Sequence, residues 1–111
     1  MLSHMRDHYC GLLTEADVGK VVHLSGWVQR TRDLGGVVFV WLRDREGLVQ
    51  LVFDSADCSP EMLALAQSLR SEYVVAAVGT VRERESKSKK IPTGDIEVFV
   101  TELRILSKAE T

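Results

Sequence analysis

The sequence lacks the features that usually mark an enzyme or a metal site. It has two cysteines in 111 residues, Cys10 and Cys58, and neither has a partner at metal-ligand spacing. Its three histidines, His4, His8 and His23, form no motif with a nucleophile and no metal motif such as HExxH. We therefore interpret both cysteines as reduced and structurally incidental, and we expect a non-catalytic module without catalytic residues or a metal site.

Long apolar runs are also missing. No run approaches the roughly 20 residues that a transmembrane helix needs. The N-terminal residues lack the apolar core of a secretory signal. We therefore expect a cytoplasmic protein with no membrane partner.

An excess of positive charge is absent too, because the net charge is −2. This excludes a protein that holds nucleic acid mainly through a positive field over its whole surface. Basic side chains nevertheless gather near a few predicted strand ends and turns: Arg30, Arg32, Arg43, Arg45, Arg82 and Arg84. Any nucleic-acid site must therefore be local.

What is present is enough for one domain with one core. A chain of 111 residues buries roughly 60–70% of its unfolded surface when it folds. We expect an N-terminal segment, residues 1–18, with a short helical turn at Thr14–Val18, capped by Thr14 and ended by Gly19. Residues 19–111 then form the folded domain.

Alternation of apolar and polar residues predicts five strands, at 21–32, 37–43, 48–53, 73–84 and 95–106. Gly26 and Gly79 lie inside two of them and indicate bends. Residues 44–47 form a hairpin turn, Ser59-Pro60 starts a helix that ends near Arg70, and residues 85–94 form a loop. The residues predicted to face the core from the strands are Val22, Leu24, Gly26, Val28, Val38, Val40, Leu42, Val49, Leu51, Phe53, Ile96, Val98 and Val100.

A single helix between the third and fourth of five antiparallel strands is the plan of the OB-fold, an all-β, five-stranded, partly open Greek-key barrel. A small sandwich is the alternative, but it gives no reason for a helix at that place. OB-folds bind single-stranded nucleic acid or oligosaccharide on the outer face of strands two and three.

That face carries groups suited to RNA. Phe39 points outward and offers a surface on which a base can stack. Gln50 can read a base edge, and Glu97 can accept hydrogen bonds from a purine. The four arginines at the strand ends suit phosphates and base carbonyls: Arg30, Arg32, Arg82 and Arg84.

Each residue also has an ordinary structural interpretation. Phe39 can cover a hydrophobic edge, and Gln50 and Glu97 can belong to a solvated strand face. The arginines can pair with Glu83, Glu85, Asp33 and Asp44 as surface charges. We expect Trp27 to pack rather than bind. Trp41, outward beside Phe39, is either a stacking platform or a contact for another domain.

The stretch GWVQRTRDLGGVVFVWLRDREGLVQLVF, residues 26–53, resembles the N-terminal anticodon-binding domain of bacterial aspartyl-tRNA synthetases. The resemblance begins at HYCG and continues through SLRSEYVV, GTVRER and PTGDIEV, so it covers nearly the whole chain. Two positions depart from the family pattern, which commonly has an acidic residue at Trp41 and a basic one at Thr31.

The resemblance implies that the anticodon loop of aspartate tRNA lies splayed on the barrel face. Phe39 would stack the central uridine and Gln50 would read its edge. Glu97 would read the first base, a guanine or its modified form. The third base and the nearby loop would be served by Arg82, Arg84 and Arg32.

The resemblance also implies a parent enzyme, a class II synthetase that attaches aspartate to tRNA with ATP and magnesium, and that is a homodimer. This chain contains none of its catalytic motifs, so we expect no cofactor in this domain and a catalytic domain elsewhere in the parent. A sequence-tolerant single-strand binder and a protein-contact domain using Trp41 and Phe99 remain alternatives.

Overall fold

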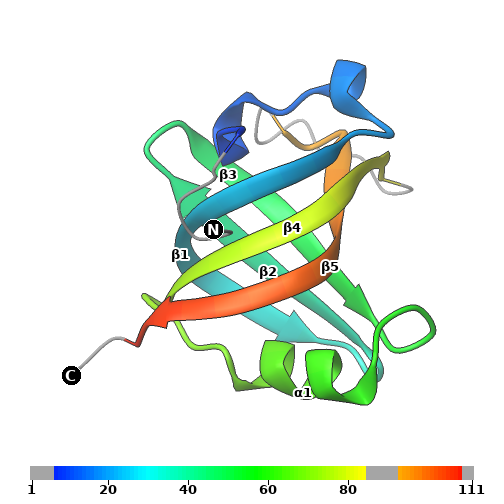
Figure 1. Ribbon diagram of the computed structural model, residues 1–111, viewed down its shortest axis with the longest axis vertical. Coiled ribbons are helices and arrows are strands. Elements are labelled where there is room, and N and C mark those ends of the chain that lie inside the picture. Colours follow the sequence, from blue (N-terminus) through cyan, green and yellow to red (C-terminus); the bar gives the residue numbers. More distant parts are fainter. Residues whose placement is uncertain (1–6, 85–92, 109–111) are drawn as a thin grey trace.

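The computed structural model describes residues 7–84 and 93–108 and contains a closed five-stranded barrel. Figure 1 shows the barrel with its single helix, α1, across one end and the N-terminal turns across the other. The predicted OB-fold with one helix between the third and fourth strands is confirmed. The elements in order are η2 (Cys10–Leu12), η3 (Glu15–Asp17), β1 (Val21–Asp33), β2 (Val37–Asp44), β3 (Gly47–Asp54), α1 (Pro60–Ser68), β4 (Val74–Glu83) and β5 (Ile96–Ser107).

The strands follow the order β1-β2-β3-β5-β4, and β4 pairs with β1 to close the ring. Four neighbouring pairs are antiparallel, whereas β3 and β5 are parallel through Leu51 with Val98 and Val52 with Phe99. The prediction of antiparallel pairing throughout is therefore wrong at this junction. A closed ring with an odd number of strands cannot alternate direction at every step.

The core lies inside the barrel and contains every side chain that the alternation predicted for it, together with residues that were not predicted, among them Cys10, Leu13, Val75, Ala77 and Val81. Aliphatic residues from every strand are at most 2% exposed, among them Val22, Leu42, Leu51 and Val98. Burying an aliphatic side chain of this size contributes about 1.5–3 kcal/mol. Gly26 is also buried, and a Cβ atom there would lie 2.2 Å from the carbonyl oxygen of Arg43, so β1 approaches β2 more closely than a larger residue allows.

The helix closes the lower end of the barrel in Figure 1. Ser59 caps it by accepting a hydrogen bond from the Met62 N–H at 3.1 Å, and Pro60 occupies the first turn, as predicted. Ala66 and Leu69 are buried against the core. The helix ends at Ser68, two positions before Arg70, because Leu69 is already extended.

The N-terminal residues close the opposite end. Thr14 caps η3 as predicted. The element η2 was not predicted, and its Cys10 is fully buried in the core. Both cysteines are free, yet the interpretation of Cys10 as structurally incidental is wrong. Its backbone N–H donates to Oδ2 of buried Asp44 at 2.6 Å. A Cβ atom at Gly11 would lie 2.0 Å from the Glu46 carbonyl oxygen, so this glycine lets the segment approach the hairpin.

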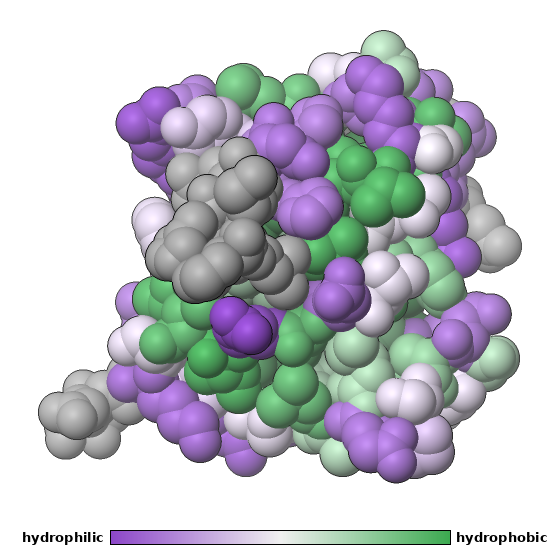
Figure 2. Space-filling view, viewed as in Figure 1, coloured by the Kyte–Doolittle hydropathy of each residue, from purple (hydrophilic) through white to green (hydrophobic). Residues whose placement is uncertain are grey.

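Figure 2 shows the face formed by β1, β4 and β5, where hydrophobic surface lies between polar groups. Exposed hydrophobic side chains of these strands include Val21, Trp27 and Leu106. Trp27 is 36% exposed, so neighbouring side chains cover much of its indole, and the expectation that it packs rather than binds stays a prediction. It stands on β1 opposite Val74 and Arg43, in the outward series of the alternation.

Candidate nucleic-acid interface

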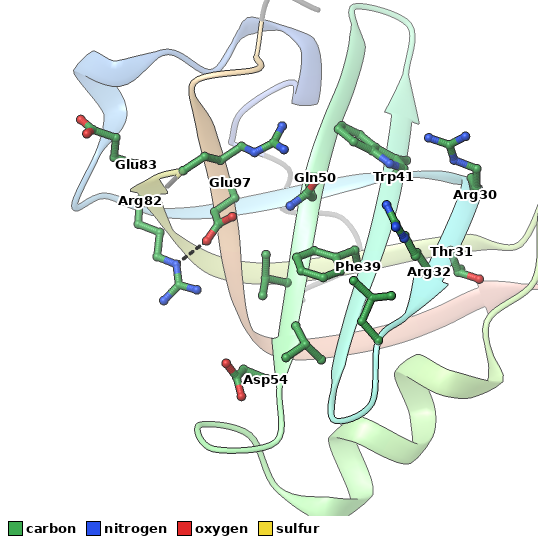
Figure 3. Close-up of a pocket in the computed structure, with 14 residues that line it drawn as sticks. Arg30, Thr31, Arg32, Phe39, Trp41, Gln50, Asp54, Arg82, Glu83 and Glu97 are labelled. Carbon is green, nitrogen blue, oxygen red and sulfur yellow. Dashed lines mark hydrogen bonds and ion pairs between the residues drawn. The ribbon is translucent and has the colours of Figure 1, made fainter. Parts of the chain in front are cut away.

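The outer faces of β2 and β3, with the ends of β1, β4 and β5, line a groove of about 830 Å³ (Figure 3). Strand alternation places every second side chain of β2 and β3 on this surface. All the residues singled out in the sequence as a candidate site line the groove: Arg30, Arg32, Phe39, Gln50, Arg82, Arg84 and Glu97. Trp41, which the sequence left open, lines it too.

Phe39 stands near the middle of this surface in Figure 3. Its neighbours on β2, Val38 and Val40, are buried in the core, so the ring is directed outward. Val52 of β3 is paired with it and is only 3% exposed. The half-buried ring therefore rests beside an apolar residue and presents a surface to the groove on which a base can stack.

Gln50 is the buried polar residue of the groove. It lies opposite Trp41 in the β2–β3 pairing and is 6% exposed. The alternative that it belongs to a solvated strand face is wrong, because the neighbouring aromatic side chains and strand ends shield it. Its side chain makes no hydrogen bond to any residue in the described part of the chain. Although little of the residue is exposed, its amide is not one of the fully buried groups that lack a partner, so the amide still reaches solvent in the groove. An occupant of the groove can supply the partner.

Arg82 and Glu97 form a charged pair across β4 and β5. Arg82 Nε donates to Glu97 Oε2 at 2.7 Å, and the guanidinium carbon lies 4.2 Å from the centre of the Phe99 ring. The Glu97 side chain is 13% exposed and that of Arg82 is 44% exposed. Glu97 is therefore held in place beside a positive charge, which reduces its repulsion of a phosphate.

Two of the four acidic partners proposed for the arginines as ordinary surface charges are engaged elsewhere. Asp33 accepts from Gln67 at 3.2 Å, and Asp44 accepts from backbone N–H groups. Glu85 lies outside the described residues, as does most of the predicted 85–94 loop. That alternative is wrong for Arg82, because its carboxylate partner is Glu97, directly across the strand pair.

The remaining arginines flank the groove. The Arg84 guanidinium carbon lies 5.8 Å from the centre of the Trp41 ring, and its Nη1 is buried without a hydrogen-bond partner in the part of the chain that is described. Arg30 and Arg32 are exposed at the end of β1 and form no ion pair with another described residue. These side chains are available to an anionic ligand.

Some lining residues were missed in the sequence. Val52 and Asp54 follow Gln50 at intervals of two on β3, so the same alternation that placed Gln50 indicates them as well. Thr31, Leu34, Val37 and Glu83 complete the lining.

Among residues 7–84 and 93–108, no group of three or more His, Cys, Asp or Glu side chains could hold a metal ion. Nor does that part of the chain include a helix with the length and apolarity to cross a membrane.

Known proteins match this chain over nearly its whole length. Aspartate–tRNA ligase of Staphylococcus aureus is 53% identical over 108 residues, which are 96% of this chain and 18% of the ligase. The chain thus spans less than a fifth of the curated relatives that it matches.

Solved structures of tRNA synthetases and of an OBody also match this chain over most of its length. Asparaginyl-tRNA synthetase from Pyrococcus horikoshii superposes with a TM-score of 0.81 and 31% identity, over 95% of this chain and 24% of that one. Aspartyl-tRNA synthetase from Entamoeba histolytica superposes with a TM-score of 0.79 and 28% identity, over 88% of this chain and 20% of that one. OBody AM2EP06, solved bound to hen egg-white lysozyme, superposes with a TM-score of 0.84 and 29% identity, over 95% of this chain and 96% of that one.

The family of tRNA anti-codon domains, described as OB-fold nucleic acid binding domains, matches residues 22–106. This match covers all five strands of the barrel and every residue that lines the groove. The chain therefore belongs to the tRNA anti-codon family of OB-fold nucleic acid binding domains.

Proposed function

We propose that this chain is the anticodon-binding domain of an aspartate–tRNA ligase, with residues 19–111 as the binding unit, and that the groove holds the anticodon loop of aspartate tRNA. The similarity to aspartate–tRNA ligases supports the identity of the RNA. The observation that carries the binding mode is the largely buried Gln50, whose amide has no hydrogen bond to a described residue and which lines the same groove as the outward ring of Phe39. Stacking on an aromatic ring and hydrogen bonding to base edges are the means by which proteins read single-stranded RNA.

The roles of the bases in this proposal are those that the family resemblance implies. The central uridine stacks on Phe39 and its edge is bound by Gln50. The first base, a guanine or its modified form, meets Glu97, whose carboxylate accepts from purine donors. Arg82 and Arg84 serve the third base and the adjacent phosphate. The exposed Arg32 reaches the loop backbone from the end of β1.

The rest of the ligase supplies the chemistry in this proposal. Attachment of aspartate to the tRNA, with ATP and magnesium, takes place in a catalytic domain, and the ligase acts in the cytoplasm as a homodimer. The role of this domain is to select the tRNA.

The test is a titration of this chain with an anticodon stem-loop carrying GUC, beside the same stem-loop with the central uridine replaced. Preference for GUC supports the proposal. Equal binding of both would favour a sequence-tolerant single-strand binder, and binding of neither would favour a protein-contact domain; either result overturns it.

The salt dependence of binding tests a second part of the same proposal, that few phosphates of the RNA are bound. We expect about three phosphate contacts, because few arginines flank the groove, and hence a slope of log K against log salt of about −2. Titrations between low and moderate salt measure it. A slope several times steeper would mean that the phosphate backbone, and not the bases, dominates binding.

A further inference from the structure

Trp41 has no role in the binding mode described so far. It follows Phe39 by two residues on β2, and Val40 between them is fully buried, so both rings stand on the same outward face. Both line the same groove, and Figure 3 shows Trp41 beside Phe39 on this strand. The indole is therefore placed where a second aromatic surface could meet the same ligand.

The surroundings of Trp41 are polar and cationic. Gln50 lies opposite it on β3, and Arg30 lies opposite it on β1. The Arg84 guanidinium carbon is 5.8 Å from the ring centre, and Arg84 Nη1 is buried without a partner in the described residues. An apolar protein partner would have to desolvate these groups without pairing them, which is costly. An RNA strand offers base oxygens and phosphates to pair with them.

We propose that Trp41 is a second stacking platform, which takes the third anticodon base, next to the uridine on Phe39. The third base is assigned because Arg84, the residue expected to serve it, lies beside the indole. This inference rests on the proposed function and deepens it.

The spacing of the two rings fits neighbouring nucleotides. Residues two apart on a strand are separated by about 6.6–6.8 Å, roughly twice the 3.4 Å step between stacked bases. The two bases are then unstacked from each other, and each rests on its own ring. Splayed bases on aromatic side chains are the usual form of single-stranded RNA in protein sites.

The first experiment uses the fluorescence of Trp41 itself. The chain has two tryptophans, so Trp27→Phe leaves Trp41 as the single reporter. Trp27 is on β1 and does not line the groove. We expect the GUC stem-loop to quench Trp41, with binding as tight as that of the unsubstituted chain. In the matched variant Trp41→Phe, which keeps Trp27, we expect no quenching.

The second experiment measures affinity. Trp41→Leu keeps an apolar side chain but removes the stacking surface, and we expect a loss of about 5- to 150-fold in affinity for the GUC stem-loop. Trp41→Phe retains a ring, and we expect it to keep most of the affinity. Trp27→Leu is the control on the other face, with no expected loss.

A stem-loop that is abasic at the third anticodon position then identifies the stacked base. We expect Trp41→Leu and the unsubstituted chain to bind this RNA equally, because the base that Trp41 contacts is gone. A stem-loop abasic at the first position should still show the difference between them.

Two results would overturn the inference while leaving the proposed function in place. In both, the chain prefers GUC over the RNA with a replaced central uridine. In one, Trp41 is not quenched and Trp41→Leu binds like the unsubstituted chain. In the other, the Trp41→Leu loss persists with the RNA abasic at the third position. If the chain shows no preference for GUC, the proposed function fails and this inference fails with it.

Discussion

The hairpin turn and the outer face of the β2–β3 ribbon treat their polar groups in opposite ways. At the hairpin end, Asp44 is 3% exposed and accepts from the N–H groups of Cys10 at 2.6 Å and Glu46 at 2.9 Å. In the groove, Gln50 is 6% exposed, and neither its amide nor Arg84 Nη1 has a side-chain hydrogen bond to a described residue. The hairpin turn pairs its buried carboxylate within the fold, whereas the groove leaves donors and acceptors without partners among the described residues.

This difference separates structural from binding roles. A buried carboxylate that receives two backbone N–H groups stabilises the fold, because those donors would otherwise be unpaired. The Gln50 amide has no hydrogen bond to a described residue and reaches the groove, so a ligand there can pair with it without breaking a contact of the fold. Substitutions at the hairpin end should therefore change stability, and substitutions in the groove should change binding.

The largest effect is expected for Asp44→Ala. It leaves the N–H groups of Cys10 and Glu46 without their acceptor. The Cys10 N–H is buried, and a buried unpaired group costs about 1–3 kcal/mol, whereas the N–H of exposed Glu46 can bind water and only the net contribution of its hydrogen bond, about 0.5–1.5 kcal/mol, is lost. We expect the free energy of unfolding to fall by about 1.5–4.5 kcal/mol, measured by urea denaturation. Asp44→Asn, which keeps one oxygen acceptor, should lose less. A loss below about 1 kcal/mol in Asp44→Ala would mean that this end is not held by the carboxylate.

Phe39→Ala should have the next largest effect, on binding. Loss of the stacking surface should weaken binding of the GUC stem-loop by about 1–3 kcal/mol. The free energy of unfolding should change less, because the ring is only partly buried. Phe39→Tyr, which keeps the ring face, serves as the matched control. Unchanged affinity in Phe39→Ala would remove this residue from the site.

Gln50→Met tests whether Gln50 acts in binding rather than in stability, because methionine has a similar length and no amide. Stability should stay the same or rise, since the amide has no hydrogen bond to a described residue that could be lost. Preference for the central uridine over a replaced base should fall by about 0.5–1.5 kcal/mol, the net contribution of a hydrogen bond. Paired titrations with both stem-loops measure this preference. A marked loss of stability would show that Gln50 supports the fold instead.

The smallest effect concerns Asp17 in the N-terminal turn. The backbone N–H of Thr14 at 3.0 Å, and then the Lys20 ammonium at 3.1 Å, lower the pKa of Asp17 below its ordinary value of 3.8. A lowered pKa in the folded state means that the charged form stabilises the fold above pH 3.8, and that this contribution disappears as the pH falls below it. Because the pair is near the surface, the contribution is at most about 1 kcal/mol.

Asp17→Asn tests whether the contribution of Asp17 to stability disappears in acid. The variant should be slightly less stable than the unsubstituted chain at pH 6, and the difference should shrink as the pH falls below 3.8. Urea denaturation at several pH values measures the difference. A gap that widens in acid would contradict the assignment, and groove affinity at pH 6 should be the same in both chains.

Local pattern was sufficient for much of the fold. Alternation alone identified Val38, Val40 and Leu42 as core and placed Phe39 outward, because strand side chains alternate whatever the strand's partner. Ser59 followed by Pro60 was sufficient for the helix start, because a cap acts within one turn. Contacts between distant segments were not predictable in this way.

The candidate site shows the same division. All seven residues that the sequence singled out line one groove, since the OB-fold brings the ends of β1, β4 and β5 to the β2–β3 face. The burial of Gln50 and the ion pair of Arg82 with Glu97 were not predicted. Both depend on which side chains lie opposite each other on neighbouring strands. The parallel pairing of β3 with β5 was not predicted either, because it follows from closure of the five-stranded ring.

Residues close together in the chain are sufficient for the strands, the helix, the core faces and the chemical character of one outer face, because each of these depends on local pattern. Which polar groups are paired depends instead on the closed barrel. Asp44 finds its partner 34 positions away in Cys10, whereas Gln50 is enclosed on the groove with no side-chain partner among the described residues. Burial and hydrogen bonding between distant segments exist only once the barrel has closed.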